Sequence, residues 1–142
     1  MHVDVRRVFV SSKQSELNGT FSPDGRWVAY QSNASGRYEI VVRPFPNKDP
    51  ARTISRDGGR YPRWRGDGKE LFFVSPDGTM MAAGFDATNG VSQGVPQPLF
   101  STQIRGGDNR PYAVDKNGQR FLLKVAPDPQ VVVMDWQTLL DR

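Results

Sequence analysis

The sequence predicts an all-β protein made of about three similar units of four strands each. Short apolar runs of strand length recur along the 142 residues, and few segments show helical periodicity. The 14 glycines and 11 prolines are spread between these runs. Scattered glycine and proline are typical of many short elements joined by turns, whereas a clustered distribution would indicate a linker. The whole pattern favours repeated β-hairpins.

A turn motif that occurs three times is the main signal. Its copies are Phe21-Ser22-Pro23-Asp24-Gly25, Trp64-Arg65-Gly66-Asp67-Gly68 and, more weakly, Val114-Asp115-Lys116-Asn117-Gly118. Each copy places Asp or Asn before Gly, and these residues tolerate the positive φ of a tight reversal. The glycines stand at 25, 68 and 118, so the intervals are 43 and 50 residues. This spacing predicts a β-propeller, whose four-stranded blades repeat every 40–50 residues or so.

The apolar runs between these turns predict the individual strands. We expect strands at 17–22, 26–32, 38–44 and 51–55 in the first blade, at 60–65, 70–75, 79–86 and 95–101 in the second, and at 110–115, 119–125 and 130–136 in the third. One more strand is expected at 6–10 and a short helix at 136–140. The prediction is a single partial propeller over 1–142, with blades at about 11–57, 58–102 and 103–136. Residues 3–10 would be an outer strand of a neighbouring blade.

The stretch 21–30, followed by Gln31-Ser32-Asn33, resembles the TolB-type, WD-repeat-like propeller repeat. That repeat has an aromatic residue, Ser-Pro-Asp-Gly, and a strand ending in an aromatic residue and a small polar pair. The second copy departs from it at Arg65 and Gly66, and the third keeps only Asn117-Gly118. The resemblance implies a propeller fold but leaves function open, because this scaffold hosts unrelated functions.

The stretches 42–46 and 62–72 also resemble the C-terminal propeller regions of some bacterial serine/threonine kinases. The chain itself has no Gly-rich nucleotide loop and no His-Arg-Asp or Asp-Phe-Gly motif. The resemblance favours a periplasmic or otherwise extracytoplasmic location. No signal segment is visible in the chain, so the sequence leaves the compartment open.

Few residues have the chemistry of a catalytic or metal site. The chain lacks cysteine, and its single histidine is His2, beside the terminus. This excludes disulfides and thiolates, and it argues against a Ser-His-Asp triad or an imidazole zinc site. The aspartates at 24, 67 and 77 fit turn formation better than a calcium loop, since the further acidic ligands are missing. We therefore expect no enzyme activity, no cofactor and no metal.

An arginine cluster at the start of the second blade is the best candidate for a binding site. If 60–65 is the innermost strand, alternation places Tyr61, Arg63 and Arg65 on one face and Pro62 and Trp64 on the other. Trp64 would then belong to the core, and Arg63 would point toward the central channel. The candidate ligand-binding residues are Arg60, Tyr61, Arg63, Arg65, Arg110 and Tyr112. Such a set suits carboxylate or phosphate groups; the alternative is solvated arginine, or arginine paired with aspartate across blades.

The charge pattern limits the classes of partner. The formal net charge is +4 without a long run of like charge, which favours acidic partners. Nucleic acid is not expected, because a basic stripe with interleaved aromatic residues is missing. No apolar run approaches the 18 residues or so of a membrane span.

The number of blades predicts a further partner. A propeller closes with about four to eight blades, so three blades leave open sheet faces. We expect a homodimer that completes a six-bladed ring, with 5–10 of one chain as the outer strand of the other chain's third blade. The competing explanation places the missing blades in a longer parent chain.

The absence of catalytic groups favours a non-catalytic binding or scaffold module for a protein or a small anionic ligand. Such a module would suit the sensor or interaction end of a larger signalling protein. One alternative is the propeller component of a hydrolase or peptidase whose catalytic part lies outside this chain. Another is a structural remnant without a ligand.

Overall fold

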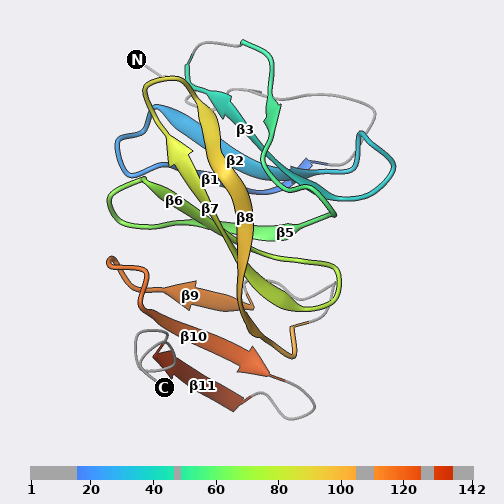
Figure 1. Cartoon of the computed structure of the whole chain (residues 1–142), viewed down its shortest axis with the longest axis vertical. Coiled ribbons are helices and arrows are strands. Elements are labelled where there is room, and N and C mark those ends of the chain that lie inside the picture. The colour runs from blue at the N-terminus through green and yellow to red at the C-terminus, as the bar shows by residue number, and fades with distance from the viewer. Residues whose placement is uncertain (1–15, 47–48, 105–110, 126–129, 136–142) are drawn as a thin grey trace, which may run out of the picture.

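The computed structural model describes residues 16–46, 49–104, 111–125 and 130–135, and within these it contains eleven strands and no helix. The strands form three antiparallel sheets that follow one another along the chain and lie in sequence along its long axis (Figure 1). This confirms the all-β prediction. The strand expected at 6–10, the helix expected at 136–140 and Arg110 lie outside the described residues.

Each sheet keeps its strands in chain order, as hairpins joined by short turns require. Sheet 1 contains β1 (Glu16–Phe21), β2 (Trp27–Ser32), β3 (Glu39–Pro44) and β4 (Arg52–Thr53). Sheet 2 contains β5 (Arg60–Trp64), β6 (Glu70–Val74), β7 (Thr79–Asp86) and β8 (Val91–Ser101). Sheet 3 contains β9 (Tyr112–Val114), β10 (Arg120–Val125) and β11 (Gln130–Asp135).

Three strands differ clearly from the prediction in length. β4 has only two residues, β9 has three where 110–115 was expected, and β8 begins at Val91 instead of 95. The early start of β8 follows from the turn before it, where the Gly90 N–H donates to the Asp86 carbonyl over 2.7 Å and Gly90 has a φ of 68°. The chain therefore reverses within four residues, and Val91 already pairs with Asp86. β8 is the edge strand of sheet 2 and carries Pro96 and Pro98.

The repeated turn motif forms the reversals that the sequence predicts. Gly25, Gly68 and Gly118 have φ near 70°, and each donates its N–H to the carbonyl three residues earlier at 2.8–3.1 Å. The aspartates stabilise these turns: Asp24 Oδ1 accepts from the Arg26 N–H at 3.0 Å, and Asp67 Oδ1 accepts from the Lys69 N–H at 2.9 Å. In the described residues the motif aspartates therefore act as turn formers.

Gly66 explains why the second turn departs from the repeat. Its N–H donates to the Lys116 carbonyl of the third turn at 2.8 Å. A Cβ at this position would lie 2.8 Å from the same oxygen. Proline, found at the equivalent Pro23, has no N–H to donate and would meet this backbone. Glycine thus fixes the turn of sheet 2 on the turn of sheet 3.

Sheet 2 is the centre of the protein because it is buried on both faces. Along β6, Leu71 and Phe73 face sheet 1 while Phe72 and Val74 face sheet 3. The first cluster contains Ala29, Ile40, Val42, Ile54, Trp64, Leu71, Phe73, Ala83 and Phe85. The second contains Tyr61, Phe72, Val74, Met80, Ala82, Ile104, Tyr112, Phe121 and Leu123. Strands covered on both faces read as continuous apolar runs, as β6 does.

Candidate ligand-binding site

The first strands of the three sheets are joined by a row of buried hydrogen bonds. Gln31 Oε1 accepts from Asn18 Nδ2 at 2.7 Å and from the Tyr61 N–H at 3.0 Å. The Tyr112 hydroxyl donates to the Tyr61 carbonyl at 2.5 Å. Burial raises the pKa of Tyr112, so this hydroxyl stays protonated as a donor. The row connects β1, β2, β5 and β9 and fixes the strand that carries the predicted site.

Tyr61 has a backbone conformation that side-chain-bearing residues rarely adopt. Its φ is 60°, and the β5–β6 register shifts between Arg60 and Arg63. Asn18, 43 residues earlier, has a φ of 58° and marks an equivalent shift in β1. Both Tyr61 backbone groups are bonded to neighbouring sheets, which holds the bulge in place. The bulge sets the direction of Arg60 and Arg63.

Arg63 is the candidate residue best placed to meet a ligand. Its guanidinium lies over the Tyr112 ring, 5.6 Å from the centroid, and its Nη1 donates to the Pro62 carbonyl at 2.8 Å. The residue is half-buried, and no carboxylate of the described residues pairs with it. Stacking on a tyrosine holds a guanidinium in position while its outer N–H groups stay able to bind an oxyanion.

The other arginines of the predicted cluster lie apart from Arg63. Arg60 stacks on Tyr38 of the preceding sheet, 4.7 Å from the ring centroid. Arg65 pairs with Asp67 at 2.8 Å and with Glu70 at 3.2 Å. The Asp67 ion pair raises the pKa of Arg65 and lowers that of Asp67. The structure therefore brings Tyr61, Arg63 and Tyr112 together, while Arg65 is neutralised within its own hairpin.

Trp64 and Pro62 belong to the core, as alternation predicts. Trp64 faces sheet 1, where it stacks edge-on against Phe85 at 5.1 Å between centroids. Its indole N–H donates to the Thr20 carbonyl of β1 at 3.1 Å. Trp27 also packs on Phe85, and its indole Nε1 is buried without a hydrogen-bond partner among the described residues. Trp64 fills the junction between the sheets, whereas Trp27 is half-buried and lines a cleft at one end of this junction.

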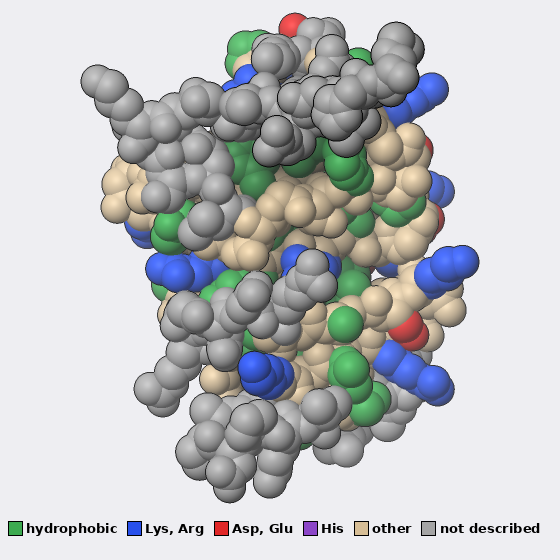
Figure 2. All heavy atoms as spheres, turned by 180° about the vertical axis from the view of Figure 1, so that it is seen from behind, with side chains coloured by type: hydrophobic (Ala, Val, Ile, Leu, Met, Phe, Trp, Pro, Cys, Tyr) green, Lys and Arg blue, Asp and Glu red, His purple; other side chains and the backbone are tan. Residues whose placement is uncertain are grey.

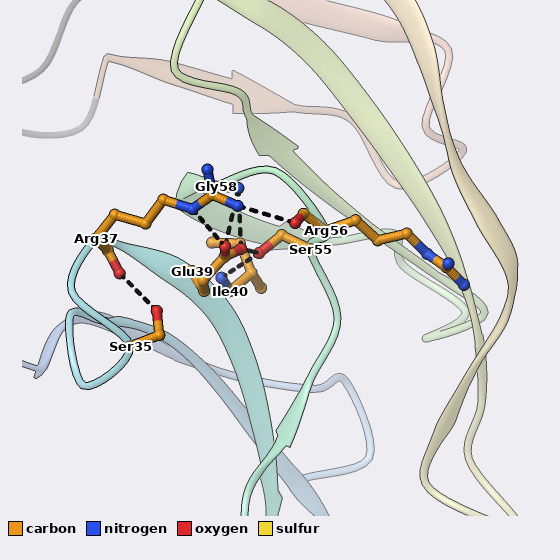
Figure 3. A network of polar contacts seen from close by, with 7 residues as sticks. All are labelled: Ser35, Arg37, Glu39, Ile40, Ser55, Arg56 and Gly58. Carbon is orange, nitrogen blue, oxygen red and sulfur yellow. Dashed lines mark hydrogen bonds and ion pairs between the residues drawn. The ribbon is translucent and has the colours of Figure 1, made fainter.

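The sequence analysis missed a buried carboxylate, Glu39. Its oxygens accept from the Gly58 N–H at 3.0 and 3.1 Å and from the Ser55 hydroxyl, and Arg37 pairs with it at 2.9 Å (Figure 3). The Ser55 Oγ in turn accepts from the Ile40 N–H at 2.7 Å. This network fixes the link between sheets 1 and 2, which makes it structural. The signal for Glu39 in the sequence was its position directly before the apolar run Ile40-Val41-Val42.

Two clefts lie at opposite ends of the junction between sheets 1 and 2. One has a volume of about 390 Å³ and is lined by Arg56, Asp57, the 75–77 turn and the apolar Val95, Pro96 and Pro98 of β8. Figure 3 shows the Arg56 side chain pointing away from the Glu39 network. The other has a volume of about 650 Å³ and is lined by three acidic turns, at Asp24, Asp67 and Asp86. Both volumes fall in the range of small-ligand sites.

Three further observations on the described residues concern metal sites, membrane spans and basic surfaces. They contain no group of three or more His, Asp or Glu side chains placed to hold a metal ion. In that same part of the chain no helix is long and apolar enough to cross a membrane. On the face seen in Figure 2, the lysine and arginine side chains of the described residues are separated by apolar and neutral ones and form no continuous stripe among themselves.

Comparison with known proteins gives likeness at the level of fold. No family model and no curated protein matches the sequence. Among solved structures, TolB from Acinetobacter baumannii superimposes with a TM-score of 0.64 at 16% identity, covering 88% of this chain. Oligogalacturonate lyase from Vibrio parahaemolyticus gives 0.60 at 11% identity over 83%, and an oligogalacturonate lyase in complex with manganese gives 0.53 at 15% over 87%.

TolB and oligogalacturonate lyase are β-propellers. The chain has a propeller-like fold. It spans 31% of the TolB chain and 36% and 35% of the two lyase chains, so the likeness concerns one part of each. The propeller resemblance predicted from the turn motif is thereby supported. The resemblance to kinase-associated propellers stays a prediction, since these structures bear on the fold alone.

Proposed function

We propose that this propeller-like chain is a non-catalytic binding module, and that Arg63 is the anchor for a carboxylate or phosphate group of its ligand. The observation that carries the proposal is the Arg63 guanidinium, which stacks on Tyr112 and pairs with no carboxylate among the residues that the structure describes. Tyr112 is buried and supports the half-buried Arg63 guanidinium from below, so little side-chain entropy of Arg63 is lost when it binds. A small anion and an acidic protein segment both carry the charged oxygen atoms that such an arginine binds.

Arg60 is a second anchor of the same kind. It stacks on Tyr38, is half-buried and has no carboxylate partner among the described residues. Because it reaches toward sheet 1 while Arg63 reaches toward sheet 3, the two arginines would bind separate groups. An extended acidic peptide fits this separation better than one compact anion does.

The alternative, a propeller component of a hydrolase or peptidase, gains no support from the site. Each cleft contains a serine hydroxyl that donates to an aspartate, Ser75 to Asp77 and Ser22 to Asp24. The same serines accept the Thr79 and Trp27 N–H groups at 3.1 Å, so we interpret these pairs as turn contacts. The lyase likeness covers about a third of that enzyme and extends to fold alone. That the chain is not an enzyme stays a prediction. Its location outside the cytoplasm also stays a prediction.

Titration with small anions tests the binding proposal. Isothermal calorimetry with inorganic phosphate, citrate and an acidic peptide should show binding of at least one probe. Arg63→Gln should weaken it by at least about tenfold, as expected for the loss of one charge-assisted hydrogen bond. Arg65→Gln is the matched control, because the Arg65 guanidinium is already paired with Asp67 and Glu70. Equal losses in both variants, or no binding by the wild type, would contradict the proposal.

A further inference from the structure

The smaller of the two clefts, of about 390 Å³, opens onto the apolar core between sheets 1 and 2. It is lined by Phe73 of β6, which is buried in the cluster of this junction, and by the half-buried Met81 of β7, which packs against the same cluster. Pro98 of β8 pairs with Met81 across the strands and also lines the cleft. We name this site the β8 cleft. Its lining offers an apolar surface to a small molecule.

A bulge in β8 adds an exposed apolar residue to this lining. The register between β7 and β8 shifts between Ala82 and Gly84, and the extra residues of β8 include Gly94, with a φ of 75°, and Val95. Val95 is 55% exposed and lines the cleft. Bulges redirect side chains at the edges of sheets. Here the bulge leaves an apolar side chain at the β8 cleft only partly covered by the protein.

Arg56 is held at the same cleft by the buried Glu39 network (Figure 3). Its carbonyl accepts from Arg37 Nη2 at 3.0 Å, while Ser55 before it and Gly58 after it are bonded to Glu39. The Arg56 side chain is exposed and points away from the network, and no carboxylate among the described residues pairs with it. The backbone of Arg56 is therefore fixed, and its guanidinium is able to bind an oxyanion.

Two carboxylates, those of Asp57 and Asp77, also line the cleft. The Ser75 hydroxyl and the Thr79 N–H donate to Asp77 and lower its pKa, so this group is ionised at neutral pH. Asp57 is exposed and forms no ion pair with a lysine or arginine of the described residues. The described lining thus carries one positive group and two negative groups, and none of them is paired with another.

These charges limit the class of ligand. A simple anion would meet two carboxylates, and a simple cation would meet a guanidinium. A zwitterion carries both charges, and an apolar group attached to it suits the rest of the lining. We propose that the β8 cleft binds a free amino acid with an apolar side chain, whose carboxylate contacts Arg56 and whose ammonium group lies near Asp57 and Asp77. The inference does not rest on the proposed anion site, because Arg63 does not line this cleft.

Nuclear magnetic resonance titration of the full chain with L-phenylalanine tests the proposal. Signals of cleft residues such as Gly58 and Thr79 should shift as phenylalanine is added. Phenylalaninamide lacks the carboxylate and glycine lacks the apolar side chain, so each should bind at least about tenfold more weakly. N-Acetylphenylalanine lacks the ammonium group and should also bind more weakly than phenylalanine.

Two variants with matched controls separate the charged contact from the apolar one. Arg56→Gln should weaken phenylalanine binding by at least about tenfold, whereas Arg52→Gln removes an exposed arginine of β4 outside the cleft and should leave it unchanged. Val95→Ser should weaken binding by about threefold or more. Its control is Val133→Ser, since Val133 is 61% exposed but lies on β11. All four side chains are exposed, so the variants should fold.

Three outcomes would overturn the proposal. The first is the absence of any shift with phenylalanine or leucine up to about 10 mM. The second is equal binding of phenylalaninamide, or an equal loss in Arg56→Gln and Arg52→Gln, since either result would mean that Arg56 holds no carboxylate. The third is a set of shifts confined to residues outside the cleft.

Discussion

The junction between sheets 1 and 2 and the junction between sheets 2 and 3 contain different kinds of side chain. Sheets 1 and 2 meet through apolar side chains together with a buried carboxylate, a glutamine and close-packed glycines. At Gly59 a Cβ would lie 2.8 Å from both Ile40 and Phe73. Sheets 2 and 3 also stack rings edge-on, Phe121 with Phe72 at 5.1 Å and with Phe100 at 5.2 Å, and add the Tyr112 hydroxyl and the Gly66 N–H as hydrogen-bond donors. Both junctions are filled by rings, and the first differs from the second in its buried charged network at Glu39.

The largest effect is expected in the junction between sheets 2 and 3. Phe121→Ala should lower the free energy of unfolding by about 3–5 kcal/mol, because a fully buried ring leaves a cavity that its aromatic neighbours cannot fill. Urea denaturation monitored by tryptophan fluorescence measures this. Phe121→Leu should cost clearly less, and equal losses in the two variants would show that packed volume is not what matters here.

The next effect is expected in the junction between sheets 1 and 2. Glu39→Ala leaves the Gly58 N–H and the Ser55 hydroxyl without their acceptor and should cost about 2–3 kcal/mol. The same denaturation experiment measures the loss. Arg37→Ala is the control: its side chain is 56% exposed, so removing it should cost less than about 1 kcal/mol. A larger cost for Arg37 than for Glu39 would contradict the assigned roles.

A smaller effect is expected at Gly66, where the second turn departs from the repeat and bonds to the third turn. Gly66→Pro introduces the proline found at the equivalent Pro23, yet it should destabilise the fold by about 1–2 kcal/mol, because it removes the N–H donated to Lys116. Thermal unfolding checks this. The reverse change at the equivalent turn, Pro23→Gly, should cost less than about 1 kcal/mol, through backbone entropy alone. If Gly66→Pro raised the melting temperature, the turn-to-turn bond would be unimportant.

The smallest effect is a dependence of stability on pH. The pKa of Asp24 is lowered by the Ser22 hydroxyl and that of Asp77 by the Ser75 hydroxyl, both below the usual 3.8. The pKa of each carboxyl is lower in the folded state than in the unfolded state. Its contribution to the stability of the fold is therefore complete above the unfolded pKa and is lost as the pH falls through the folded pKa. The melting temperature should therefore fall below about pH 4. Asp24→Asn should flatten this fall slightly, and an unchanged pH profile would contradict the turn role.

The regular part of the fold was predictable and the junction chemistry was not. The Asp-Gly turns and the double-sided apolar run of β6 are local patterns, so the strands and the burial of Trp64 follow from them. The pairing of Arg65 with Asp67 was also local, but it was not predicted. The stack of Arg63 on Tyr112 joins residues far apart in the chain, and the bulge at Tyr61 depends on bonds to two other sheets. Periodicity shows that a position is buried without showing which distant group it meets.

The prolines of β8 have a consequence for how the protein behaves in concentrated solution. An unprotected outer strand can recruit further strands and grow into insoluble fibres. Pro96 and Pro98 have no N–H to offer, so the outer rim of the middle sheet cannot act as a template along that stretch. Among the described strands, β11 is an edge of sheet 3 and has consecutive valines without a proline. Aggregation on storage should therefore begin at the C-terminal sheet.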